Sequence, residues 1–376
     1  MTTGNPEGQG ISRRKFLTGG AAAGAAAMLL AGCRSTQGSS GSSGGGGGGG
    51  VGNFPKTPQY NFVFVNHVTT NPFFTATQYG IQDACAILSC KYQWTGSENS
   101  IVSEMVNAMN TAIDGNADGI AVSIVDPKAF NEPILKAYQK GIPVVAYNAN
   151  GAPGKPNPAL AYIGQDLYQS GVEMGKRIAQ LVKRGKVALF IATPGQLNIQ
   201  PRIDGAKAGI KQSGAPIQVS EVATGAQVND ELNRIDAYYQ GHKDVKGMFA
   251  VDAGSTQGVG QVMKKYGLHA KGVRGGGYDL LPKTLQFIKQ GHLDFTIDQQ
   301  PYEQGFWPVM QLYLWQISGG LMSPSTTSTG LKFVTKDNVD PYLNSKSRYE
   351  GSSKKEKLIK PPSKISPPST YSPSSS

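Results

Sequence analysis

The sequence predicts an α/β protein with two doubly wound, Rossmann-like lobes, each built on a parallel sheet. Short apolar runs, typical of buried parallel strands, alternate with helical patterns along the body of the chain. This alternation has the rhythm of βα units, because parallel strands need helical crossovers. The expected strand ends recur every 25–29 residues in a first series and every 21–31 in a second: Asn66, Trp94, Ser123 and Asn148, then Ala192, Ala223, Asp252, Tyr278 and Gln299. Two such series indicate two α/β lobes.

Individual elements follow from the same patterns. The clearest strands are residues 61–66, 120–123, 143–147, 186–191, 248–251 and 295–297. A helix is expected over 101–113, where apolar residues recur at spacings of three and four. Another is expected to begin at Asp126-Pro127, a capping residue followed by proline at the first helical position. Residues 151–158 (GAPGKPNP) then form a loop between the two series.

The charge of the chain does not favour a nucleic-acid partner. The 376 residues carry a formal net charge of +11. Residues 1–53 account for +3 of it and residues 351–376 for +4, which leaves +4 for the body. A polynucleotide-binding body is usually more basic and more clustered. Three Cys and four His do not favour a structural zinc site, so we expect neither metal nor cofactor.

The first 33 residues resemble a twin-arginine lipoprotein signal. Residues 12–17 (SRRKFL) form a positively charged start with Arg13-Arg14, and residues 18–30 are a short apolar run. That run is too short to span a hydrocarbon core of about 30 Å. Residues 30–33 (LAGC) resemble the lipobox of bacterial lipoproteins, which implies lipidation of Cys33 and a membrane anchor. The alternative is a chance arginine pair and a chance cysteine beside an apolar stretch.

Two further segments are expected to be disordered. Residues 34–53 contain seven consecutive glycines and many serines, so they cannot bury enough apolar surface to fold and should act as a flexible linker. Residues 351–376 are rich in Ser, Pro and Lys and should form a disordered tail.

Polar residues gather where the expected strands end. In open parallel sheets, ligands bind just beyond the carboxyl ends of the strands. The residues at these places are Asn66, His67, Asn71, Ser123, Asp126, Asn148 and Asn150 in the first series and Arg202, Asp252 and Asp279 in the second. The alternative for any one of them is a cap or a turn former, and for Asp126 a helix cap is the better interpretation.

Five short motifs in order resemble the ribose-type (type I) periplasmic sugar-binding proteins of ABC transporters. They are TNPFF at 70–74, IGQD at 163–166, RIDG at 202–205, GYD at 277–279 and TIDQQP at 296–301. Together they extend over about residues 60–335. The resemblance implies two lobes joined by a hinge of three segments, with a small sugar or polyol bound between them. It also implies a monomer without catalytic residues that delivers its ligand to an ABC permease.

The resemblance also implies the extent of each lobe. Residues 54–165 and about 300–328 would form the first lobe. Residues 166–299 and about 329–350 would form the second. Gln165, Asp166 and Gln299-Gln300 would lie where the chain crosses between them.

Eight residues would bind the ligand if the resemblance holds. Asn71 would donate to and accept from hydroxyls, Phe73 and Phe74 would pack on the ring faces, and Arg202 would fork onto two oxygens. Asp252 and Asp279 would accept hydroxyl protons, Gln299 would bond from the hinge, and Asn148 would contribute a neutral amide. Charged groups make the stronger hydrogen bonds to hydroxyls. The alternatives are core packing for Phe73 and Phe74 and a surface salt bridge for Arg202.

Two departures from the family pattern bear on the ligand. Asn148-Ala149 stands where the family has Asp-Arg, and an aromatic residue is missing near Ala226-Gln227. Ribose itself is therefore less favoured, and another pentose, a hexose or a polyol such as inositol is at least as well supported.

Three other functions compete with ligand delivery. An enzyme is not favoured, because the H-E-x-x-H, G-x-S-x-G and Walker A motifs are absent from the body of the chain, residues 54–350. Catalysis by a nucleophilic cysteine is not favoured either, because Cys85 and Cys90 lie at an expected helix end and strand start. Their spacing allows a disulfide outside the cell. A sugar-responsive transcription factor needs an N-terminal helix-turn-helix, where this chain has a signal and a linker. A sugar-sensing subunit for a membrane receptor kinase is not separable from a transport receptor.

Overall fold

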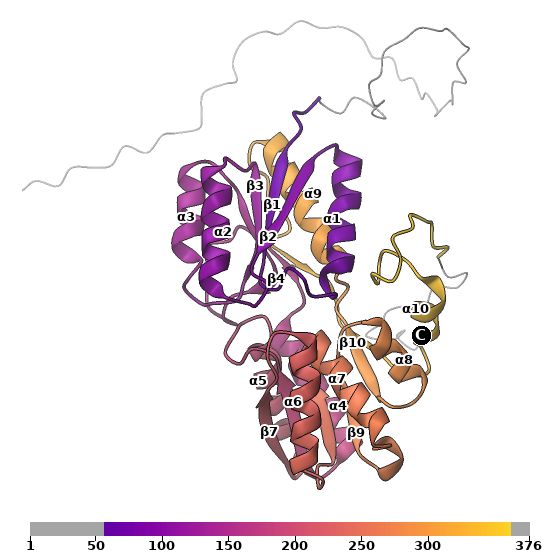
Figure 1. Ribbon diagram of the computed structural model, residues 1–376. Helices are drawn as coiled ribbons and strands as arrows, with labels where there is room; N and C mark the ends of the chain where they lie inside the picture. The colour runs from indigo at the N-terminus through magenta and orange to yellow at the C-terminus, as the bar shows by residue number, and fades with distance from the viewer. Residues whose placement is uncertain (1–55, 362–376) are drawn as a thin grey trace, which may run out of the picture. The chain divides into compact units, whose positions relative to one another are not determined.

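The computed structural model describes residues 56–361 (Figure 1). The twin-arginine signal, Cys33, the linker at 34–53 and the tail beyond 361 lie outside the described residues, so these stay predictions. The described chain forms two α/β lobes, each with a six-stranded sheet. This is the architecture that the sequence predicted. Within residues 56–361 we find no helix with the length and apolarity needed to span a membrane.

The sheet of the first lobe has the strand order β2-β1-β3-β4-β5-β11, and all neighbouring strands are parallel. Its strands are β1 (Asn61–Asn66), β2 (Lys91–Gly96), β3 (Gly119–Ile124), β4 (Val144–Asn150), β5 (Tyr162–Gly164) and β11 (Thr326–Ser328). Its helices are α1 (Phe74–Leu88), α2 (Val102–Asp114), α3 (Asn131–Gln139) and α9 (Glu303–Ser318). Figure 1 shows α2 and α3 on one face of this sheet and α1 and α9 on the other.

Strand β1 shows why the first lobe has two layers of core. Side chains alternate along a strand, so neighbouring residues face opposite sides of the sheet. Val63 and Val65 pack with the residues of α2 and α3, whereas Phe62 and Phe64 pack with those of α1 and α9. Because both faces are covered, the strand is apolar almost throughout, as its sequence indicated.

The second lobe repeats this order as β7-β6-β8-β9-β10-β12. Its strands are β6 (Gly185–Ile191), β7 (Ile217–Ala223), β8 (Gly247–Ala250), β9 (Arg274–Tyr278), β10 (Phe295–Asp298) and β12 (Lys332–Val334). Its helices are α4 (Leu167–Val182), α5 (Gln200–Gln212), α6 (Val228–Gly241), α7 (Ala253–Lys265), α8 (Pro282–Lys289) and α10 (Asp340–Ser345), with a short 3-10 helix, η1 (His269–Lys271). Strand β12 is antiparallel to β10, whereas β11 is parallel to β5.

Glycines let α4 and α5 approach at backbone contact. A Cβ atom on Gly171 would lie 2.3 Å from the carbonyl oxygen of Arg202, and one on Gly205 would lie 2.1 Å from that of Tyr168. Side chains at these positions would push the helices apart. The close approach therefore fixes the backbone of Arg202, which is one of the predicted ligand-binding residues.

One expected helix start is wrong. The sequence predicted a helix from Asp126-Pro127, but α3 begins at Asn131. Asp126 Oδ1 accepts hydrogen bonds from the amides of Lys128 and Ala129, both at 2.8 Å, and so caps a turn rather than the helix itself. The competing signal was the Asx-type turn, which aspartate favours as strongly as a helix start.

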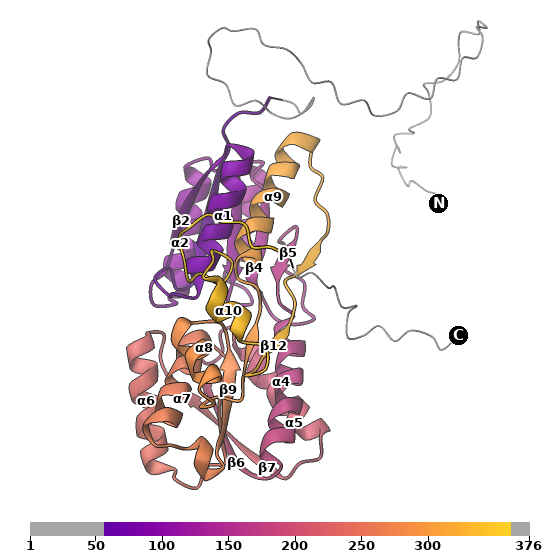
Figure 2. The ribbon, with the colours of Figure 1, turned by 90° about the vertical axis from the view of Figure 1, so that its right-hand side faces the viewer.

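The C-terminal part of the expected second lobe also differs. We call residues 346–354 the C-terminal strap. Arg348 of the strap binds Asp83 of α1, in the first lobe, with Nε–Oδ2 and Nη2–Oδ1 distances of 3.0 and 2.7 Å. Its guanidinium also lies over the Tyr79 ring, 4.4 Å from the centroid. Figure 2 shows the chain passing from α10 to α1. The sequence did not indicate this return, because it depends on a partly buried ion pair between residues far apart in the chain.

Candidate functional site

All eight predicted ligand-binding residues line one cavity between the two lobes. They are Asn71, Phe73, Phe74, Asn148, Arg202, Asp252, Asp279 and Gln299. Four further residues complete the lining: His67, Asn198, Ile199 and Ala253. The cavity measures about 50 Å³. Residues of both lobes line this small volume, so it lies where the lobes meet.

Two equivalent strand ends use left-handed backbone to place polar side chains in the cavity. Asn148 near the end of β4 has φ 62°, and Asp279 directly after β9 has φ 75°. Residues other than glycine rarely adopt this conformation, and it clusters at functional sites. The amide Nδ2 of Asn148 donates to Gln304 Oε1 at 3.0 Å, and Gln299 Nε2 donates to Asp279 Oδ1 at 2.6 Å. Both side chains are therefore held in place.

The segment between β1 and α1 supplies the aromatic wall. Asn71 Oδ1 accepts from the amide of Phe73 at 3.0 Å, which tightens the turn before the helix. The rings of Phe73 and Phe74 meet edge to face with centroids 4.7 Å apart. Both belong to the core under α1 as well as to the cavity lining. These two residues therefore pack in the core and also have surface facing the cavity.

Arg202 is buried rather than part of a surface salt bridge. Its side chain is 2% exposed, and Nη1 donates to the carbonyl oxygen of Val251 at 2.9 Å. Nη2 lies 3.4 Å from Gln165 Oε1, and the guanidinium stacks 4.1 Å above the centroid of the Tyr278 ring. A flat cation held by a carbonyl and an aromatic face is rigid, which suits the recognition of a small polar ligand.

The two carboxylates of the second lobe lie in an environment of low polarity. Burial raises the pKa of Asp279 to about 7, although Arg202 and the hydrogen bond from Gln299 act in the opposite direction. Burial also raises the pKa of Asp252, while bonds from the amides of Ser255 (2.8 Å) and Ala192 (3.0 Å) oppose that shift. Asp252 therefore caps α7 and ties it to the end of β6, in addition to lining the cavity.

His67 and Asn198 join the lobes inside the cavity, and neither is among the eight ligand-binding residues expected from the sequence. Burial, and to a lesser degree the charge of Arg202, lowers the pKa of His67 to about 3, so the imidazole is neutral. Asn198 Nδ2 donates to His67 Nε2 at 3.0 Å, which leaves the proton on Nδ1 to be donated to Ser123 Oγ at 3.0 Å. The position of His67 after the first strand was a usable signal, whereas Asn198 stands in no motif.

Two buried polar atoms of the lining residues have no partner: Nε of Arg202 and Oδ1 of Asn198. One is a donor and the other an acceptor. Leaving such atoms unpaired in a buried site costs about 1–3 kcal/mol each. A hydroxyl group both donates and accepts, so a polyhydroxyl ligand can satisfy both atoms. The arrangement therefore suits recognition of a sugar or polyol.

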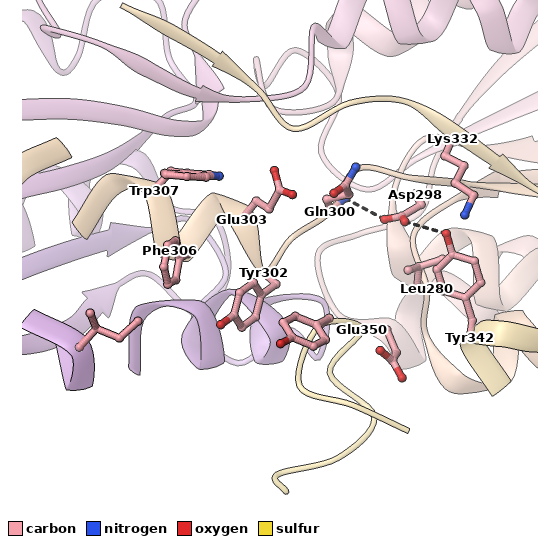
Figure 3. Close-up of a pocket in the computed structure, with 12 residues that line it drawn as sticks. Leu280, Asp298, Gln300, Tyr302, Glu303, Phe306, Trp307, Lys332, Tyr342 and Glu350 are labelled. Carbon is pink, nitrogen blue, oxygen red and sulfur yellow. Dashed lines mark hydrogen bonds between the residues drawn. The ribbon is translucent and has the colours of Figure 1, made fainter. Parts of the chain in front are cut away.

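A larger hollow of about 690 Å³ lies on the hinge side, and none of the eight predicted ligand-binding residues lines it (Figure 3). It is lined by aromatic residues, among them Tyr302, Trp307 and Tyr342. Its buried acid, Asp298, already accepts from Tyr342 Oη at 3.0 Å and from the amide of Gln300 at 2.8 Å. None of the residues that line this hollow has a buried side-chain polar atom without a partner, in contrast to Arg202 and Asn198 in the cavity between the lobes.

Comparison with known proteins identifies the class. Residues 62–317 match the family model of the periplasmic binding protein domain, so the chain belongs to this family. Its fold is the type I fold that the motifs indicated, since solved sugar-binding proteins of that fold superpose on it. The family acts outside the cytoplasm, and this extracytoplasmic location therefore holds for the chain.

Three similar proteins are each associated with a particular sugar. The chain is 54% identical over 314 residues to the xylose/arabinose-binding protein XylF of Sulfolobus acidocaldarius, covering 80% of this chain and 77% of that protein. A solute-binding protein of an ABC transporter from Burkholderia graminis, solved with D-arabinose, is 27% identical with a TM-score of 0.70, over 77% and 100% of the two chains. The arabinose-binding protein AraP of Geobacillus stearothermophilus is 28% identical with a TM-score of 0.59, over 76% and 99%.

Proposed function

We propose that the protein captures an aldopentose in the cavity between its lobes and delivers it to an ABC importer. The observation that carries this proposal is the pair of unsatisfied buried atoms, Arg202 Nε and Asn198 Oδ1, in a cavity lined from both lobes. The names of XylF and of the arabinose-binding structures support a pentose as the ligand. They also support a role in binding rather than in catalysis.

The lining residues divide the recognition of the sugar. Arg202, Asp252 and Asp279 form charge-assisted hydrogen bonds to hydroxyls, which are the stronger kind. Asn71 and Asn148 add neutral amides, and Phe73 and Phe74 pack against the weakly apolar face of the ring. Arg202 Nε and Asn198 Oδ1 gain the partners that they lack. The neutral His67 holds Asn198 in position through Nε2.

Binding requires the lobes to open and close. The chain crosses between the lobes after β5, after β10 and between β11 and β12. Gln165, Asp166 and Gln299-Gln300 lie at the first two crossings and should absorb the rotation, because hinges are a few residues at element ends. The ligand shifts the population to the closed form, since only that form offers contacts from both lobes. Small-angle scattering should show a smaller radius of gyration on saturation with sugar.

A sugar panel tests the proposal. A ligand that binds only the folded state stabilises it by about 2.7 kcal/mol at 100 times its Kd, so the melting temperature rises by several degrees. We expect D-xylose and L- or D-arabinose to raise it more than ribose, hexoses or inositol do. The matched control is Arg202→Ala, which should show a much smaller shift at the same sugar concentration. A shift with hexoses alone would contradict the pentose assignment, and no shift with any sugar would contradict the function itself.

We further propose that the protein is held at the outer face of the cell membrane through a lipid on Cys33. The support is the order of Arg13-Arg14, the apolar run and the LAGC sequence. Cys33→Ala should release the protein from membranes, as measured by fractionation. Replacing Arg13 and Arg14 with Lys should block export. Mass spectrometry that finds an unmodified Cys33 in the mature chain would contradict the anchor.

A further inference from the structure

The two cysteines of the described chain meet at the C-terminal end of α1. The helix ends at Leu88, and the next residue, Ser89, has a left-handed φ of 54°. The amide of Cys90 then donates to the carbonyl oxygen of Cys85 at 3.1 Å. This is the backbone bond of a Schellman helix end, which brings the side chains at its two positions together. Such ends usually carry an apolar contact there, but here both side chains are thiols.

The two thiols differ in their surroundings. Cys85 is 6% exposed and belongs to the core under α1, whereas Cys90 is half-buried at the edge of that core. The side chains are hydrogen-bonded to each other, which raises the pKa of Cys85 and lowers the pKa of Cys90. Cys85 is thus the donor, and Cys90 is the sulfur that more readily becomes a thiolate. An accessible thiolate beside a buried thiol is the arrangement that thiol–disulfide exchange requires.

We propose that Cys85 and Cys90 form a disulfide that links the end of α1 to the start of β2. The oxidant is a disulfide compound outside the cytoplasm. The Cys90 thiolate attacks it, forms a mixed disulfide and releases one thiolate. Cys85 then loses its proton to solvent, and its sulfur attacks Cys90 Sγ and expels the second thiolate. The two protein thiols are oxidised, and the external disulfide is reduced to two thiols.

The bond stabilises the fold without touching the sugar site. Helix α1 has 15 residues, and at a rise of about 1.5 Å per residue its two ends lie about 20 Å apart. Phe74, at the other end, lines the cavity. We therefore expect oxidation to raise the melting temperature by a few degrees and to leave the Kd for sugar unchanged. This expectation is independent of the proposed ligand.

The test uses the full-length chain incubated with oxidised glutathione, then denatured, alkylated with iodoacetamide and digested with trypsin. Cleavage after Lys56 and Lys91 leaves both cysteines on the peptide 57–91. We expect this peptide to carry no alkyl group and to weigh about 2 Da less than its reduced form, because oxidation removes two hydrogen atoms. After dithiothreitol it should carry two alkyl groups. Two alkyl groups, or two bound glutathiones, without dithiothreitol would overturn the proposal.

A matched variant separates the bond from the effects of the reductant. Cys90→Ser leaves the core residue Cys85 in place and removes only the half-buried partner. The melting temperature of the oxidised wild type should fall on reduction, whereas that of Cys90→Ser should be the same with and without dithiothreitol. An equal fall in both proteins would show that the reductant acts elsewhere and would overturn the stabilising role.

Discussion

The two lobes share one strand order but supply different chemistry to the cavity. The first lobe contributes neutral groups: the amides of Asn71 and Asn148, the imidazole of His67 and two phenyl rings. The second contributes the charged groups Arg202, Asp252 and Asp279. Each charged group has a bond within its own lobe, to Val251, Ser255 or Gln299, and Arg202 also bonds to Gln165 of the first lobe. The second lobe thus holds the charged groups that form the stronger hydrogen bonds, and the first lobe faces them with neutral polar groups and aromatic rings.

The largest expected effect removes the cation of the second lobe. Arg202→Ala leaves the sugar hydroxyls and the carbonyl oxygen of Val251 unpaired in a desolvated site, so sugar binding should weaken by about 2–5 kcal/mol. Folding should change much less, because the guanidinium supports the site more than the core. Isothermal titration calorimetry and a melting curve measure the two quantities. If the variant unfolds while its folded fraction binds normally, Arg202 is a structural residue and the comparison between the lobes fails.

A smaller effect is expected from the equivalent change in the first lobe. Asn148→Ala removes one neutral hydrogen-bonding group and leaves Gln304 Oε1 without its donor, so binding should weaken by about 1–3 kcal/mol. The loss should be smaller than that from Arg202→Ala in the same titration. A loss equal to or greater than that of Arg202→Ala would show that charge does not distinguish the lobes.

Asp279 of the second lobe should contribute to the pH dependence of stability and of sugar binding. The pKa of Asp279 is about 7 in the fold, against about 3.9 in an unfolded chain, so the folded state binds this proton more tightly. Its contribution to the free energy of unfolding is therefore fully present below about pH 4 and is lost as the pH rises through about 7. Sugar affinity should change in the opposite direction, because the ionised carboxylate is the better acceptor.

The variant Asp279→Asn provides the control for that dependence. Its amide cannot titrate, so its melting temperature and its Kd should vary less between about pH 5 and 8 than those of the wild type. Melting curves and calorimetry at several pH values across this range measure both quantities. Identical pH profiles in the two proteins would assign the titration to another group.

The smallest expected effect concerns contacts between the lobes outside the cavity. Gln227 Nε2 donates to the carbonyl oxygen of Glu98 at 3.0 Å and to Asn99 Oδ1 at 2.8 Å. These bonds are solvent-exposed and join the two lobes, so Gln227→Ala should weaken sugar binding by about 0.5 kcal/mol. The change should appear mainly as faster sugar release in stopped-flow measurements. A slower release would show that Gln227 does not favour closure.

The local part of the site could be predicted from the sequence, because parallel strands bring their carboxyl ends to one edge of a sheet. Asn148, Asp252 and Asp279 each stand at such an end, and the motif around Asn71 and Phe73 directly follows the first strand. Apolar runs and helical spacing fix these positions within a residue or two. Their convergence in space then follows from the topology alone.

The features formed by two distant parts of the chain were visible only in the tertiary structure. His67 and Asn198 are 131 residues apart, and Arg348 and Asp83 are 265 apart. No local pattern marks such pairs, because each partner alone is an ordinary polar residue in a loop or on a helix. The sequence by itself predicted most of the strands, the helical crossovers between them and the polar residues at their ends. Only packing decided which of those residues remain unsatisfied, since burial removes the water that would otherwise pair with them.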